Sequence, residues 1–307
     1  MLQIRSPPKE RAVTNTTESR NPRTLNLDEL GTEEFLTVMN DEDRRVPAAV
    51  AEALPEIALA VDLIAERMRS GGRLIYLGAG TSGRLGVLDA AECPPTFGTD
   101  PGEVIGLLAG GEGAMFRAVE GAEDSASLGA DDLRGINLTL DDVVVGIAAS
   151  GGTPYVIGGL DHARGIGAGT VSLTCNRGAP VSDHADVAIE VDNGPEVLTG
   201  STRLKAGTSQ KLVLNMLSTA TMVRLGKVYG NLMVDVKATN IKLRDRVIRI
   251  VRAATDCSAD EAKAALDQAD NHAKTAIVMI LCGVDAPTAR ERLATADGFV
   301  RSAITRQ

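Results

Sequence analysis

Glycines and hydroxyl side chains gather where an apolar stretch gives way to a loop, in residues 73–95 (RLIYLGAGTSGRLGVLDAAECPP). The run 74–77 is typical of a buried strand, and the chain after it is typical of a helix that begins near Ser82. The glycines let the backbone approach a ligand, while Thr81 and Ser82 add hydroxyl groups beside the free N–H groups and positive dipole of a helix N-terminus. This combination predicts a loop that binds a phosphate group.

A second loop of similar chemistry follows the predicted strand 143–148 and ends at a proline. Because the carboxyl ends of parallel strands meet at one edge of a sheet, we expect both loops to close on the same anion. The residues of the second loop are Ser150, Gly151, Gly152 and Thr153.

A third polar turn, 200–205 (GSTRLK), precedes a helix predicted over 206–225, whose Leu, Val and Met spacing indicates core packing. The turn could be a solvated helix start, or it could add hydrogen-bond donors and positive charge to the anion site. We favour the second interpretation, because the other polar loops of the sheet face the same edge. The side chains concerned are those of Ser201, Thr202, Arg203 and Lys205.

The glycines of the first loop, Gly78, Gly80 and Gly83, also match the fingerprint of a dinucleotide site. Such a site needs a ribose-binding acid about 20 residues later, at the end of the second strand. The predicted second strand, 104–108, runs into alanine and glycine, and Glu112 comes too late. The loop hydroxyl groups also suit a terminal phosphate better than a pyrophosphate. We therefore prefer a phosphorylated small molecule to NAD as the ligand.

Composition narrows the class of protein. With 307 residues and 44% hydrophobic content, the chain can form one large domain with a smaller appendage. Aromatic residues make up 2% and tryptophan is absent, which argues against base stacking and against an aromatic wall for neutral sugars. The net charge of −9 argues against a nucleic-acid partner. An anionic ligand therefore needs a locally positive pocket.

The first eleven residues, MLQIRSPPKER, have no apolar stretch of signal-peptide length, and no segment has about 18 unbroken apolar residues. We expect a cytoplasmic protein without a membrane partner. The four cysteines and three histidines are scattered without the paired spacing of metal ligands. We expect no metal site.

Five apolar runs of strand length are separated by segments that are mostly long enough for crossover helices. This pattern predicts an α/β fold with a doubly wound, five-stranded parallel sheet, whose carboxyl edge carries the polar loops. The predicted strands are 74–77, 104–108, 143–148, 170–174 and 187–191.

Flanking segments differ from the sheet region. Residues up to Arg23 are polar and lack apolar periodicity, so we expect an arm supported by a partner subunit. Helices are predicted at 32–40 and, after Pro47, at 48–69. Short alanine-rich helices follow Arg246, with Ser258 and Glu261 spaced as a capping box and Gly283 as a C-cap.

The sequence therefore divides into three predicted parts. Residues 1–46 form an arm and a helix, residues 47–245 form a sugar phosphate domain, and residues 246–307 form a small helical domain.

Two carboxylates lie in segments that could carry chemistry, Glu92 and Glu123. We expect the helix begun at Ser82 to stop at Pro94 and Pro95, so the charge of Glu92 opposes the dipole at its C-terminal end. At about 1.5 Å per residue, ten residues place Glu92 roughly 15 Å from Ser82. One small sugar cannot reach both within one chain, which predicts a site shared by two chains. Spacing alone favours Glu123 as a solvated acid in an acidic segment.

The chain contains the motifs LGAGTSGRLG, AECPPTFG, AVEGAEDS, VVVGIAASGGTPYV and GSTRLKAGTSQKLVLNMLST. With these motifs it closely resembles the N-acetylmuramic acid 6-phosphate etherases, members of the sugar isomerase (SIS) domain superfamily. The resemblance covers nearly the whole chain. One departure is Gly152, where many members resemble ASGRTPY with arginine.

The resemblance implies cleavage of the lactyl ether of N-acetylmuramic acid 6-phosphate by water, which gives N-acetylglucosamine 6-phosphate and D-lactate in cell-wall sugar recycling. It implies Glu92 as the acid and Glu123 as the base, no metal or organic cofactor, and a homodimer with sites near its interface. The implied phosphate ligands are Thr81, Ser82, Ser150, Gly151 and Thr153, with Ser201, Thr202 and Lys205 in addition.

Two other functions use the same phosphate cradle. A sugar phosphate isomerase would need a single carboxylate base and would have no need for Glu92. A sugar phosphate sensor resembling the glucokinase regulatory protein would bind its ligand without turnover, but that regulator resembles a tandem of two such domains. This chain has room for one, so we favour the etherase.

Overall fold

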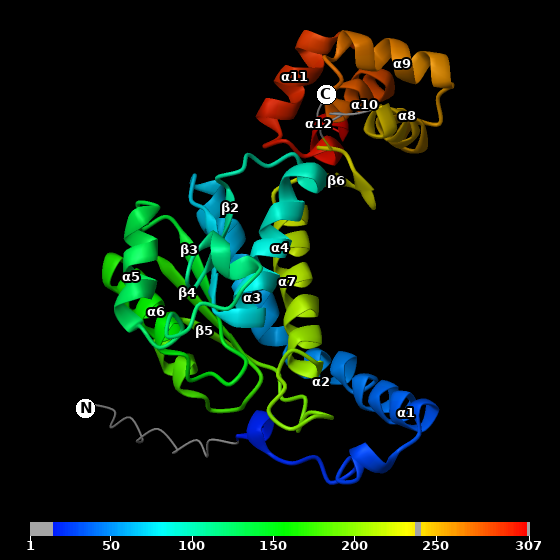
Figure 1. Cartoon of the computed structure of the whole chain (residues 1–307). Coiled ribbons are helices and arrows are strands. Elements are labelled where there is room, and N and C mark those ends of the chain that lie inside the picture. Colours follow the sequence, from blue (N-terminus) through cyan, green and yellow to red (C-terminus); the bar gives the residue numbers. More distant parts are fainter. Residues whose placement is uncertain (1–14, 237–240, 306–307) are drawn as a thin grey trace, which may run out of the picture.

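Five parallel strands form the sheet from which the candidate loops emerge (Figure 1). The computed structural model describes residues 15–236 and 241–305, without the side chains of 241–244. Each strand begins and ends within one residue of its predicted bounds, and their order, β2-β1-β3-β4-β5, is that of a doubly wound sheet. The predicted fold class is therefore confirmed. The strands are β1 (Leu74–Gly78), β2 (Val104–Leu108), β3 (Val143–Ile147), β4 (Gly169–Thr174) and β5 (Val187–Glu190).

Helices cover both faces of the sheet, as Figure 1 shows. Side chains alternate along a strand, so Leu74 and Tyr76 join the core on one face while Ile75 and Leu77 join the core on the other. The first face packs against α3 (Leu54–Arg69), α4 (Gly80–Phe97) and α7 (Lys205–Arg224), and the second against α5 (Ala126–Gly135) and α6 (Pro154–Ile166).

The strand order reverses between β1 and β3, which pair directly. Gly78, the last residue of β1, is opposite Ile147, the last residue of β3. The loops that follow these two strands therefore start side by side at the carboxyl edge, which is where ligands bind in open α/β sheets. Short 3-10 helices, η3 (Glu112–Met115) and η4 (Pro180–His184), lie in other connections of the sheet.

The helix predicted over 48–69 is divided in two. It forms α2 (Val46–Glu52) and α3, with the break at Ala53. Pro55 lies in the first turn of α3 and has no N–H group to donate to the preceding turn, so the first helix cannot continue through it.

The predicted end of α4 before Pro94 was wrong, because the helix includes both prolines and runs to Phe97. Each proline removes one helical donor, but Cys93 and Phe97 are buried in the core, and this packing holds the last turn in place. Gly98, with φ of 65°, ends the helix and donates its N–H group to the Pro94 carbonyl at 3.0 Å.

The N-terminal arm packs on its own chain. Thr16 donates its hydroxyl to Asp192 at 2.9 Å, the Thr17 N–H group donates to Asn176 at 3.2 Å, and Thr24 donates to the Val197 carbonyl at 2.9 Å. The expected support by a partner subunit is therefore wrong for residues 15–23, and the earlier part of the arm lies outside the described residues. The arm contains η1 (Thr16–Glu18) and η2 (Leu27–Glu29) and leads into α1 (Thr32–Asp43).

The C-terminal helices have an apolar core of their own, which extends from Val234 to Ala303. The capping box of Ser258 and Glu261 is confirmed, and Gly283 adopts the left-handed conformation of a C-cap. The expected boundary at 245 divides a helix, so we propose that this unit begins at the hairpin of β6 and β7. Its elements are β6 (Val228–Tyr229), β7 (Leu232–Met233), α8 (Ile241–Thr255), α9 (Ala259–Gln268), α10 (Ala273–Cys282), α11 (Ala286–Thr295) and α12 (Val300–Thr305).

A buried carboxylate, Asp142, joins the amino ends of β1 and β3. It accepts hydrogen bonds from the Arg73 amide at 2.9 Å, the Arg73 guanidinium at 2.7 Å and the Thr139 amide at 2.8 Å. Burial opposes ionisation of this carboxyl, but the hydrogen bonds from Arg73 and from the two backbone amides outweigh it and hold its pKa below the ordinary value.

We predict that Asp142→Asn lowers the free energy of unfolding by about 3 kcal/mol at pH 7, because the half-buried Arg73 guanidinium loses its buried charge partner. Since the folded-state pKa is depressed, this contribution is present above the unfolded pKa of about 3.9 and is lost as pH falls through the folded value. Urea unfolding from pH 7 to pH 3.5 measures both effects. The exposed neighbour variant Asp141→Asn is the control, and an equal loss in both variants would contradict the assignment.

Candidate active site

The first candidate loop holds α4 tightly against the sheet. A Cβ atom at Gly83 would lie 2.4 Å from the Gly78 carbonyl oxygen and 2.5 Å from a Leu108 methyl carbon, so only glycine allows this approach. The N-cap residue Ala79 offers no side-chain hydrogen bond. The N-terminal N–H groups of α4 therefore have no side-chain cap, which suits an anion.

The second loop brings another uncapped helix N-terminus to the same edge. Thr153 is the N-cap of α6 and makes no side-chain cap hydrogen bond. Ser150 is exposed, and Gly151 has φ of 78° and would place a Cβ atom 2.3 Å from that of Ala179. Asn176 holds this loop by donating its side-chain amide to the Ser150 carbonyl at 3.0 Å. The structure thus brings together the two loops that the sequence predicts to bind phosphate.

Ser82 is held by a residue that the sequence interpretation missed. The buried Ser82 hydroxyl donates to the side-chain oxygen of Gln210 at 3.0 Å. Gln210 is fully buried on α7, and its side-chain nitrogen has no hydrogen-bond partner among the described residues. The only signal in the sequence is a polar pair, Ser209 and Gln210, on a helix that otherwise packs in the core.

The N-terminus of α7 is already occupied by a carboxylate of the chain. Buried Glu196 accepts hydrogen bonds from the Lys205 amide at 3.0 Å and the Ala206 amide at 2.9 Å. Burial raises the pKa of Glu196, against the effect of these bonds. An external anion therefore cannot use this helix end as it can use those of α4 and α6.

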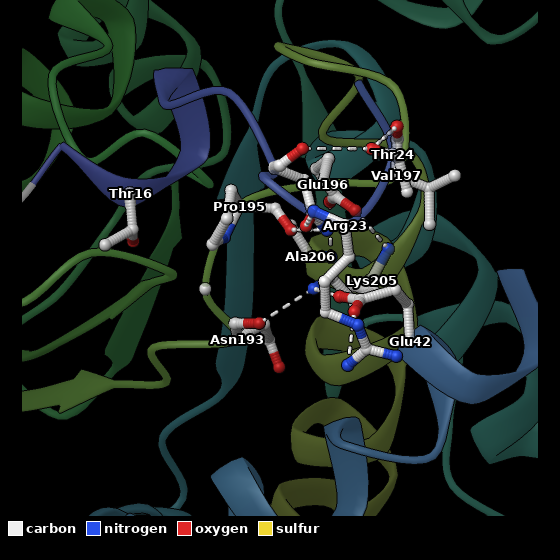
Figure 2. Close-up of polar contacts among 12 residues, drawn as sticks. Thr16, Arg23, Thr24, Glu42, Asn193, Pro195, Glu196, Val197, Lys205 and Ala206 are labelled. Carbon is white, nitrogen blue, oxygen red and sulfur yellow. Dashed lines mark hydrogen bonds and ion pairs between the residues drawn. The ribbon is translucent and has the colours of Figure 1, made fainter. Parts of the chain in front are cut away.

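The side chain of Lys205 is also paired within the chain. Its ammonium donates to Glu42 at 2.7 Å and to the Asn193 carbonyl at 3.0 Å, and Figure 2 shows Arg23 on the same carboxylate. The side chains of Lys205 and Glu42 are 0% and 1% exposed. Burial opposes ionisation of Glu42, but Lys205 and Arg23 lower its pKa. This placement does not favour the predicted role of Lys205 in holding phosphate.

The hydroxyl residues of the third turn lie nearer the candidate site. Ser201 and Thr202 are half-buried. The Thr202 carbonyl oxygen and a methyl carbon of Thr81 each lie 3.6 Å from the position of a Cβ atom at Gly207. Thr81 and Thr202 therefore both lie beside Gly207 of α7.

Glu123 lies beside the N-terminus of α4. It lines a cavity of about 280 Å³ together with Ala79, Gly80 and Arg84. The Glu123 carbonyl accepts the Tyr155 amide at 3.0 Å, which fastens the segment to α6. Arg84 donates to the Ala114 carbonyl at 2.7 Å and holds η3 beside this cavity.

Glu92 lines a different cavity, of about 180 Å³, between α4 and α7. The two cavities share no lining residue. Because α4 is continuous from Ser82 to Glu92, the two residues are separated by roughly 15 Å along the helix. Within the chain the structure places Glu123 beside the first glycine loop and Glu92 apart from it.

A half-buried acid, Asp89, lines the Glu92 cavity, and a buried thiol, that of Cys93, follows Glu92 in the chain. Asp89 accepts hydrogen bonds from the Tyr76 hydroxyl at 2.8 Å and the Ser218 hydroxyl at 3.2 Å, and burial raises its pKa. Burial, with the charges of Asp89 and Glu92, raises the pKa of Cys93 to about 12. The thiol therefore stays neutral at pH 7 and is no nucleophile.

Residues 15–236 and 241–305 also bear on two other classes of function, metal binding and membrane insertion. No group of three His, Cys, Asp or Glu side chains there could hold a metal ion. No helix there is long and apolar enough to cross a bilayer.

Solved structures support the fold. The structure superposes on a phosphoheptose isomerase from Francisella tularensis with a TM-score of 0.52 and 16% identity, over 63% of this chain and 100% of that one. A phosphoheptose isomerase from Neisseria gonorrhoeae gives 0.50 and 18%, over 62% and 98%. At such low identity these matches show a shared architecture.

Sequence comparisons identify the family. Residues 128–220 match the SIS domain, and residues 56–164 match the N-terminal SIS domain of the glucokinase regulatory protein. An N-acetylmuramic acid 6-phosphate etherase of Mycolicibacterium smegmatis is 65% identical over 94% of this chain and 97% of its own length. One from Serratia proteamaculans is 60% identical over the same shares. The chain therefore belongs to the family of N-acetylmuramic acid 6-phosphate etherases.

Proposed function

We propose that this protein cleaves the D-lactyl ether of N-acetylmuramic acid 6-phosphate with water, to give N-acetylglucosamine 6-phosphate and D-lactate in cell-wall amino sugar recycling. The observation that carries the proposal is the position of Glu123, in a cavity lined by the first turn of the helix that would hold the phosphate. The names and near-complete coverage of the relatives support the same reaction.

The phosphate site in this proposal lies between the N-termini of α4 and α6. The uncapped N-terminus of α4 supplies N–H groups and a positive dipole, and nearby hydroxyl groups supply further donors. The N-terminus of α6 adds its dipole, because Pro154 has no N–H group and the Tyr155 amide is bonded to the Glu123 carbonyl. We leave Lys205 out, because its ammonium is buried against Glu42. The residues proposed to hold the phosphate are Thr81, Ser82, Ser150, Gly151 and Thr153, with Ser201 and Thr202 at its edge.

The chemistry explains why two carboxylates are needed. Once the sugar opens to its aldehyde, the proton on carbon 2 becomes acidic, and Glu123 removes it. The carbon 2 electron pair then forms a double bond to carbon 3 as the carbon–oxygen bond breaks, and Glu92 gives a proton to the departing lactate oxygen. Water adds back at carbon 3, activated by Glu92, while carbon 2 regains a proton from Glu123.

The separation of the carboxylates favours a homodimer in which Glu92 serves the partner's phosphate loops. An apolar groove of about 830 Å³ between α3 and α7 supports this arrangement, since Leu54 and Val223 on its wall are 46% and 43% exposed. Asn215 lines both this groove and the Glu92 cavity, so an interface there would adjoin the acid. A cytoplasmic location and independence from metals, organic cofactors, nucleic acids and membranes stay predictions.

The alternatives are not favoured. An isomerase would use the phosphate loops and Glu123 but would leave Glu92 without a role. A sensor resembling the glucokinase regulatory protein would bind the sugar phosphate without releasing lactate. The etherase relatives match this chain over nearly its whole length, whereas the regulatory-protein domain matches residues 56–164.

We predict that the purified protein releases D-lactate and N-acetylglucosamine 6-phosphate in equal amounts after metal chelation. Glu92→Gln should lower kcat by about 10²- to 10⁴-fold, the usual contribution of a general acid. Coupled detection of D-lactate measures both. Glu291→Gln, on an exposed face of α11, is the control with unchanged activity. Saturable sugar phosphate binding without lactate release would instead identify a sensor.

We predict that Glu123→Gln abolishes exchange of the carbon 2 proton with deuterated water, because the base that removes this proton is lost. Proton NMR of the substrate measures the exchange. Asp124→Asn, an exposed neighbour, should retain it. Persistent exchange in Glu123→Gln, with loss in Glu92→Gln, would reverse the two assignments.

We predict that Lys205→Met lowers the free energy of unfolding by about 3 kcal/mol, because it leaves the Glu42 carboxylate buried without its ammonium partner. Adding Glu42→Gln should recover part of this loss. Urea unfolding measures both variants. A Lys205→Met protein as stable as the wild type that no longer binds inorganic phosphate would return Lys205 to the phosphate site.

A further inference from the structure

We propose that Lys211 binds the carboxylate of the lactyl group and thereby selects substrates that carry this group. The inference rests on the proposed function, in which Glu92 protonates the lactyl ether oxygen. Lys211 lies on α7 and lines the same cavity of about 180 Å³ as Glu92. Among the described residues that line this cavity, Lys211 alone carries a positive charge.

The side chains of Glu92 and Lys211 line the same cavity but do not form an ion pair with each other. In the part of the chain that the structure describes, neither Glu92 nor Lys211 forms a side-chain hydrogen bond or ion pair. Opposite charges that share a cavity and stay unpaired leave room for a group that contacts both. A volume of 180 Å³ equals about six water molecules at the density of liquid water, which is enough for a group of lactyl size.

The substrate carries two anionic groups, and the phosphate loops account for one of them. The second, the lactyl carboxylate, is attached to the same carbon as the ether oxygen. A proton donor that reaches this oxygen is therefore within a few ångströms of the carboxylate. Without a cation, the lactyl carboxylate would meet the carboxyl groups of Asp89 and Glu92, and it would repel whichever of them is ionised. Lys211 supplies the missing positive charge.

The rest of the cavity wall suits the remainder of the lactyl group. Leu85, Leu88 and Leu214 provide an apolar surface for its methyl group, while Asn215 adds an amide. A cation on one side and leucines on the other would fix the orientation of a small branched acid. Because Lys211 and Glu92 line one cavity, they act together whichever protomer supplies the phosphate loops.

A purely structural role for Lys211 makes a different prediction. Its charge favours the ionised form of Asp89, so it could serve only to compensate that half-buried carboxylate. Loss of Lys211 would then lower stability and would weaken all sugar phosphates alike. A specificity role instead predicts a loss confined to ligands that carry the lactyl group.

The test compares Lys211→Met with Lys211→Arg and with the control Lys263→Met, an exposed position on α9. We expect Lys211→Met to lower kcat/KM for N-acetylmuramic acid 6-phosphate by about 10- to 100-fold, as expected for a hydrogen bond to a charged group. The inhibition constant of N-acetylglucosamine 6-phosphate, which has no lactyl group, should change less than about twofold. Lys211→Arg should restore part of the activity, and Lys263→Met should behave as the wild type.

Binding measurements separate this inference from the proposed function. Calorimetry in a Glu123→Gln background, which holds the substrate unreacted, gives the affinity ratio of N-acetylmuramic acid 6-phosphate to N-acetylglucosamine 6-phosphate. Adding Lys211→Met should reduce that ratio, and an unchanged ratio or equal weakening of both ligands would overturn the inference. If the wild-type protein releases no lactate but Lys211→Met still reduces the ratio, the proposed reaction is overturned and Lys211 remains a lactyl-binding residue.

Discussion

The buried ammonium of Lys205 places the strongest electrostatic constraint on this structure. A charge removed from water must be compensated, and here Glu42 from α1 and the Asn193 carbonyl together surround it. The same residue donates its backbone amide to Glu196, so one position fixes the start of α7, the loop after β5 and the first helix of the chain. Because α7 then runs beside α4, this compensation sets where Gln210 and Lys211 lie.

Helix N-termini have two different uses in this protein. The one on α7 is satisfied internally by Glu196, while those on α4 and α6 have no side-chain cap. An anion is favourable at all three ends, but only an end without an internal carboxylate can accept one from solution. The internal carboxylate therefore determines which part of the carboxyl edge is available to a ligand.

Local patterns in the sequence were sufficient to predict the sheet and its two glycine loops. The central strands β1 and β3 are continuous apolar runs, buried on both faces, and glycine and hydroxyl residues follow them. The passage of α4 through Pro94 could not be predicted, because it depends on packing of Phe97 against distant parts of the chain. The same holds for the arm, whose polar residues lack periodicity but match hydrogen-bonding groups of loops about 160 residues away. The ion pair of Lys205 could not be predicted for a related reason, since its partner Glu42 is remote in sequence and has no local signal.

The continuity of α4 has a mechanical consequence. Its 18 residues form a rod about 27 Å long, with the phosphate loop at one end and Glu92 in its second half. A rigid helix transmits a displacement at its first turn to every residue it carries. If the Glu92 of one protomer completes the site of the other, any movement of α4 that a ligand causes at one loop would also move the proton donor of the neighbouring site. Occupancy of the two sites would then be coupled in free energy, and the coupling would be equal in both directions.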